Sequence, residues 1–169
     1  MIDLVRASVE TIQELEYILN NLDEQTYGEI GTKTSFSVGR HLRHIVGFYI
    51  ALQKSNQDGV ADYTVRQRNN VIETDLSIAK EQVESIKNWL PTLEKDKSIQ
   101  VKTEIQQSQT VDLTITSSLI RELAYISEHS IHHMAYINLM LKTMGINLEK
   151  EVGVAPSTAS YLRNQKANA

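Results

Sequence analysis

The chain has no cysteine among its 169 residues. Disulfide bonds, thiolate nucleophiles and zinc sites built on thiolates are therefore excluded. Any metal ion must be bound by histidine, carboxylate or main-chain oxygen. Proline is also scarce, with only Pro91 and Pro156. Because proline interrupts helices, its scarcity beside long stretches of helical periodicity favours a helical core.

The sequence also lacks clustered basic residues, and its net charge is −4. Nucleic-acid-binding domains usually carry a basic excess, so nucleic acid is not an expected partner. The N-terminus does not show the basic start and apolar run of a signal peptide. The longest apolar run, residues 45–52, is too short to span a bilayer. These absences predict a cytoplasmic protein that does not bind membranes.

Hydrophobic periodicity predicts four helices within one domain, residues 1–169. Apolar residues recur every three to four positions over residues 3–22, 37–55, 74–93 and 117–144. Residues 98–116 instead alternate with a period of two, which is typical of a β-hairpin. The connection over residues 60–70 shows neither pattern. The sequence therefore predicts an all-α fold, a four-helix bundle with a small β-hairpin between helices 3 and 4.

All five histidines fall in the second and fourth predicted helices, as His41 and His44, then His129, His132 and His133. Residues four apart lie one turn apart on the same face of a helix. His129 and His133 can therefore bind a single ion, as the histidines of H-E-x-x-H motifs do. The alternative is that they form hydrogen bonds within the core. Both lie on the buried face, where unpaired polar groups are costly, and this favours a shared metal ion.

A third ligand has to come from the second helix. On a helical wheel His41 lies about 60° from the centre of the apolar stripe and His44 about 120° from it. Spacing alone slightly prefers His41, whereas a site at the solvent-facing edge of the bundle would prefer His44. Both remain candidates on these grounds.

Two motifs and the order of the helices resemble the DinB/YfiT-like superfamily. The motifs are residues 39–45, Gly-Arg-His-Leu-Arg-His-Ile, and residues 129–137, His-Ser-Ile-His-His-Met-Ala-Tyr-Ile. The similarity extends over the whole chain, including the loop 63–68 and the tail 153–158. It implies a DinB/YfiT-type bundle with a divalent ion (Zn, Ni or Fe) bound by one histidine of the second helix and two of the fourth.

Carried over residue by residue, the implied ligands are His44, His129 and His133, with His41 as the rival that the wheel prefers. The superfamily includes thiol S-transferases that use low-molecular-weight thiols. The implied function is a metal-dependent hydrolase or thiol S-transferase acting on a small molecule, with such a thiol as one expected partner. The alternative is a non-catalytic metal- or ligand-binding bundle with a structural or vestigial metal site. A homodimer is compatible with both.

Other candidate residues surround this expected site. Glu122 shares a helix face with His129 two turns away, so it can accept a hydrogen bond from a metal-binding histidine, act as a general base or be a purely structural partner near Arg121. No catalytic residue is assigned. Tyr63, Arg66 and Arg68 are candidates for the mouth of a substrate pocket, because arginine binds carboxylates bidentately. The alternative is that these arginines tie their loop to acidic helix faces.

Overall fold

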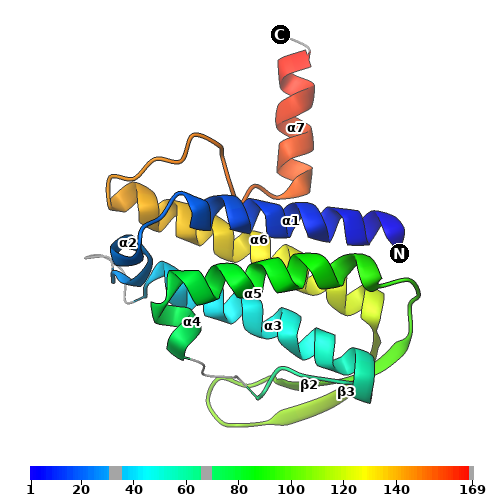
Figure 1. The fold of residues 1–169 in the computed structure, drawn as a ribbon. Helices are drawn as coiled ribbons and strands as arrows, with labels where there is room; N and C mark the ends of the chain where they lie inside the picture. Colours follow the sequence, from blue (N-terminus) through cyan, green and yellow to red (C-terminus); the bar gives the residue numbers. More distant parts are fainter. Residues whose placement is uncertain (31–35, 66–69, 168–169) are drawn as a thin grey trace.

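The computed structural model describes residues 1–30, 36–65 and 70–167, and most of this chain is helical with one small sheet (Figure 1). The four long helices are α1 (Ile2–Asn20), α3 (Val38–Asp58), α5 (Leu76–Trp89) and α6 (Leu119–Thr143). Shorter helices are α2 (Glu24–Gly28), α4 (Asn70–Thr74), α7 (Pro156–Ala167) and the 3-10 turn η1 (Leu90–Thr92). Among the described residues, no helix combines the length and the apolar character needed to cross a membrane.

The four long helices enclose a common core. α1 and α3 each pack against both α5 and α6. The apolar stripes meet there, and Ile12, Leu42, Val83 and Ile137 are fully buried. The four predicted helices are thus confirmed, with the 3-10 turn that contains Pro91 ending the third of them.

The prediction of an all-α fold is only roughly right, because the chain also contains a three-stranded sheet. Strands β2 (Ser98–Glu104) and β3 (Asp112–Ser118) form the predicted antiparallel hairpin. Strand β1 (Val60–Asp62) lies parallel to β2, within the segment expected to be a plain connection. Three residues are too few to show a period, and their pairing with β2 is a tertiary contact.

Caps fix where the two histidine-bearing helices begin. The Ser37 side chain accepts a hydrogen bond from the Arg40 N–H at the start of α3, and Ser118 does the same for Arg121 at the start of α6. Gly59, with φ of +78°, ends α3 in the left-handed conformation that favours glycine. His41 and His44 therefore lie in the first two turns of α3 and face the middle of α6.

Candidate metal centre

Three imidazole rings converge between α3 and α6. The Nε2 atom of His129 lies 2.9 Å from Nε2 of His44 and 3.2 Å from Nε2 of His133. One nitrogen of each ring lies within 4.8 Å of those of the other two, and all three side chains are half-buried. Among the described residues this is the cluster of histidine and acidic side chains whose spacing suits a metal ion.

The spacing fits a divalent ion better than hydrogen bonds between the rings. A neutral imidazole nitrogen carries either one hydrogen or one lone pair, so Nε2 of His129 cannot serve two neighbours well. An ion about 2.0–2.1 Å from each nitrogen, with angles of about 90–110°, would place neighbouring nitrogens about 2.9–3.4 Å apart. The distances of 2.9 and 3.2 Å fall in that range.

His41 lies behind the cluster rather than in it. Its Nδ1 atom is 3.0 Å from Nδ1 of His133. If His133 offers its Nε2 lone pair to a metal ion, its Nδ1–H donates to His41, which then carries its own hydrogen on Nε2. That Nε2 atom is buried and has no hydrogen-bond partner in the described chain. The structure therefore places His41 where it can orient His133. The fifth histidine, His132, lies exposed on α6.

The surroundings favour the neutral form of His129 and His133, which is the form of imidazole that binds metals. Burial lowers the pKa of His133 to about 3, with repulsion from His44 and His129 adding to the effect. Burial also lowers the pKa of His129 and, together with Arg40, that of His41. His129 and His133 can thus accept a cation without first losing a proton.

The lowered pKa of His133 makes a prediction about acid stability. Below about pH 6.5, the usual histidine pKa, the unfolded metal-free chain gains a proton that the folded His133 does not accept until about pH 3. The free energy of unfolding should therefore fall as the pH drops from about 6.5 towards 3. Above about pH 6.5 the protonation of His133 should not change it. Urea unfolding between pH 7.5 and 4.5, with a chelator present, measures the slope of the free energy of unfolding against pH.

His133→Leu should make that slope shallower by up to about one proton. The exposed neighbour variant His132→Leu serves as the control for the change in residue type. Equal slopes in the wild type and His133→Leu would show that His133 does not resist protonation.

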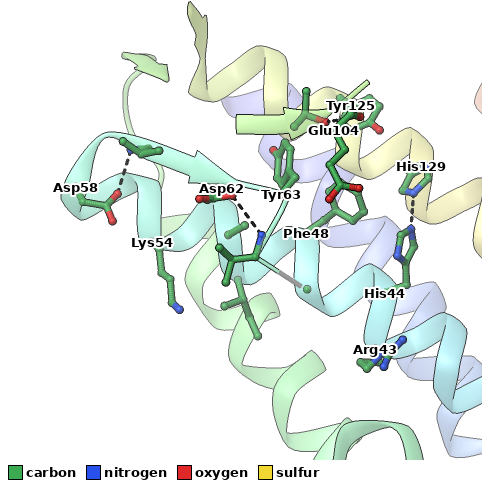
Figure 2. Close-up of a pocket in the computed structure, with 16 residues that line it drawn as sticks. Arg43, His44, Phe48, Lys54, Asp58, Asp62, Tyr63, Glu104, Tyr125 and His129 are labelled. Atoms are coloured by element: carbon green, nitrogen blue, oxygen red, sulfur yellow. Dashed lines mark hydrogen bonds between the residues drawn. The ribbon is translucent and has the colours of Figure 1, made fainter. Parts of the chain in front are cut away.

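A cavity of about 470 Å³ adjoins the cluster, within the size range of ligand sites. In Figure 2, His44 and His129 lie at one end of it and Lys54 and Asp58 at the other. The Phe48 ring is centred 5.0 Å from each of these two histidine rings. The histidine cluster and the cavity are therefore continuous.

Two tyrosines complete the aromatic wall. Tyr63 contacts Phe48 with ring centres 4.8 Å apart, and Tyr125 stacks on His129 at 5.7 Å. Both line the cavity. Phe48 and Tyr125 were not predicted as site residues, although each lies four residues from a cluster histidine and so shares its helix face.

Glu122 supports this wall and does not contact the histidines. Its carboxylate is 1% exposed and accepts hydrogen bonds from Tyr63 Oη at 3.0 Å, Ser117 Oγ at 2.6 Å and Arg121 at 2.9 Å. Burial, and then the Glu122 charge, raise the pKa of Tyr63 far above its usual range, so the hydroxyl stays a donor. Of the three roles considered for Glu122, these contacts favour the structural one, beside the cavity.

Tyr63→Phe should destabilise the fold by about 1–3 kcal/mol, because it leaves a buried carboxylate oxygen without its donor. Tyr161→Phe is the matched control, since its ring is 62% exposed on α7. Urea unfolding of both variants measures the difference. Equal, near-zero losses would show that the hydrogen bond of Tyr63 contributes nothing.

The remaining predicted pocket residues, Arg66 and Arg68, lie outside the described residues. Arg43, which was not predicted as a site residue, lines the cavity and forms an ion pair with Glu73 at 3.0 Å.

Comparison with known proteins adds one relative. No family model matches the chain, and no solved structure does. A curated protein of Rhizopus delemar named FK506-binding protein 5 is 34% identical over 112 residues, which cover 63% of this chain. The match covers 28% of that relative, so the chain spans well under half of its length.

This relative overturns the predicted activity. Its name describes FK506 binding, so the prediction of a DinB-like metal-dependent hydrolase or thiol S-transferase is wrong. The physical reason is that the histidine motifs specify where imidazoles meet and say nothing about a reaction, because the same fold and site can serve different functions. Membership of the DinB/YfiT-like superfamily stays a prediction.

Proposed function

We propose that this protein binds a divalent metal ion between α3 and α6 and uses the ion to anchor a small organic ligand in the adjoining cavity. The observation that carries the proposal is the convergence of the Nε2 atoms of His44, His129 and His133. Imidazole ligands of this kind suit zinc, nickel and iron. The proposed function is binding, and no reaction is assigned.

The position of the cluster supports the ligand part of the proposal. Three protein ligands leave at least one coordination position open for an outside donor atom. His44 and His129 also line the cavity, so a molecule in the cavity can reach that position. His133, backed by His41, lies on the side away from the cavity lining.

The chemistry of the walls defines the ligand class. One end of the ligand needs a nitrogen, oxygen or sulfur donor for the ion, and a low-molecular-weight thiol is one molecule that offers it. The middle needs an apolar, flat group that packs against Phe48, Tyr63 and Tyr125.

We further propose that the architecture is a four-helix bundle of the DinB/YfiT type. The proposal is supported by the mutual packing of α1, α3, α5 and α6 and by histidines on the second and fourth of these helices. It concerns the arrangement of the helices and carries no claim about activity. The cytoplasmic location likewise stays a prediction.

The ligand part is tested with cobalt-loaded protein titrated with imidazole and with 4-phenylimidazole. Both should alter the cobalt absorption spectrum, because the ion has an exchangeable position. The phenyl compound should bind at least about ten-fold more tightly, since its ring would pack against the aromatic wall. Phe48→Ala should reduce that difference without changing cobalt affinity. No spectral change with either compound would contradict an open position facing the cavity.

The name of the curated relative supplies a second candidate, the binding of FK506 itself. The aromatic wall would offer an apolar surface to such a ligand. Calorimetric titration of the metal-loaded and the metal-free chain with FK506 tests it, with Tyr125→Ala as the cavity variant. Binding that Tyr125→Ala weakens would assign FK506 recognition to this cavity. Absence of binding to both the metal-loaded and the metal-free chain would contradict this second candidate.

A further inference from the structure

One edge of the sheet is left open. β3 is the outer strand in the order β1-β2-β3. The hydrogen bonds from Ile105 N to Val111 O and from Leu119 N to Lys97 O extend its ladder with β2 at both ends. Because bonding alternates along an antiparallel pair, odd-numbered residues of β3 bond to β2. The N–H and C=O groups of the even-numbered residues from 112 to 116 therefore point away from the sheet, without main-chain partners in the described chain.

Two apolar side chains of β3 lie beside this open edge. Leu113 pairs with Thr103 and Ile115 with Val101, so they share the face on which Val101 is buried. Leu113 and Ile115 are nevertheless 39% and 41% exposed, whereas Ile99 and Val101 of β2 are only 2% and 3% exposed. Edge strands are commonly protected by lysine, proline or a bulge. β3 has no lysine and no proline, and its single charge is Asp112 at one end.

We propose that β3 pairs with β3 of a second copy of this chain, antiparallel about a two-fold axis at Thr114, to give a six-stranded sheet. In this register Thr114 meets its own counterpart and the two exchange main-chain hydrogen bonds. Leu113 of each copy lies opposite Ile115 of the other, so four apolar side chains join into one patch beside the core. This interface is independent of the metal site and goes beyond the proposed function.

Self-complementarity is the reason to name a second copy as the partner. The register about Thr114 places Asp112 opposite Thr116 and brings no like charges together. Moving the axis to Asp112 would set two carboxylates against each other, which is unfavourable. Moving it to Thr116 would place Leu113 beyond the end of the partner strand. The register about Thr114 thus matches the hydrogen-bonding groups, places the two exposed apolar side chains of β3 opposite each other and is symmetric, as a dimer requires.

Thr114→Pro tests the proposal because it removes the N–H group at the axis. That N–H does not bond to β2, and proline is tolerated on edge strands, so the fold should survive. Sedimentation equilibrium should show a concentration-dependent dimer for the wild type and for the control Thr114→Val, which keeps the N–H. Thr114→Pro should weaken the dimer at least about ten-fold. A wild type that stays monomeric up to about 1 mM, or a proline variant that dimerises equally, would overturn the proposal.

Cross-linking gives a second measurement if the proline variant fails to fold. The chain has no cysteine, so Thr114→Cys carries a single thiol, which the proposed register places about 5.5 Å from its counterpart between Cα atoms. A short bifunctional thiol reagent should link the two copies. Gln107→Cys, at the tip of the hairpin, is the control and should not be linked, because the tips point in opposite directions. Equal linking of both variants would contradict the register.

Discussion

Replacing His133 by alanine is expected to lower the affinity for a divalent metal ion by at least about 100-fold. The substitution removes one of the three converging nitrogens and leaves a pair, His44 and His129. Loss of a residue that only hydrogen-bonds to a metal ligand typically lowers metal affinity by about 10–100-fold, so loss of a ligand itself should lower it further. Competition with a chromophoric chelator measures the affinity for zinc and nickel directly.

His132→Ala is the matched control, because His132 neighbours His133 on α6 but lies exposed and outside the cluster. Its metal affinity should stay within about three-fold of the wild type. If His133→Ala and His132→Ala bind the metal ion with equal affinity, the ion is not bound between α3 and α6. The metal affinity of His41→Ala should lie between those of the two variants, since His41 contacts His133 without joining the proposed ligand set.

Gly153→Ala is expected to destabilise the fold by about 2–5 kcal/mol. Gly153 has φ of +73°, and a Cβ there would lie 2.1 Å from the Ala135 main-chain nitrogen and 2.5 Å from its Cα. The alanine would add about 1–2 kcal/mol of left-handed strain to about 1–3 kcal/mol of overpacking. The clash cannot be relieved by a side-chain movement, because the new Cβ would meet the backbone of α6, two residues from His133.

Gly145→Ala separates the two contributions. Gly145 has a similar φ of +81°, but a Cβ there would meet nothing within 4 Å. Gly145→Ala should therefore be destabilised only by the left-handed backbone strain, about 1–2 kcal/mol. Urea unfolding of both variants provides the comparison. Equal losses in the free energy of unfolding would show that the close approach of residue 153 to α6 does not restrict the side chain at this position.

The sequence predicts the long helices because their signal is local. The apolar stripes of α1, α3, α5 and α6, and the two-residue alternation of the hairpin, are visible in short windows. β1 has no such signal, since three residues become a strand only through pairing with β2. The same limit hides the cavity, whose walls come from α3, β1, β2 and α6.

The candidate site also has one feature that local sequence predicts and one that depends on how the helices pack. The closeness of His129 and His133 follows from their spacing on one helix. The choice between His41 and His44 depends on how α3 crosses α6, which no helical wheel contains. In the structure Nε2 of His44 meets His129, while His41 meets the far side of His133.

Glu122 shows a different limit, because a helix face does not fix where a carboxylate points. Its side chain turns to Tyr63 and Ser117 rather than to His129. The predicted reaction was wrong for a related reason. Imidazole spacing can indicate an ion, but the fate of a ligand depends on groups around the cavity that the motifs do not include.

The most direct test of the central claim is the metal content of the chain purified without a histidine tag. After dialysis against zinc or nickel and removal of loose ions, elemental analysis should find about one ion per chain. A cobalt titration should saturate at the same ratio with the spectrum of a nitrogen-bound ion. A chain that retains no zinc, nickel, iron or cobalt under these conditions would contradict the three-histidine metal centre.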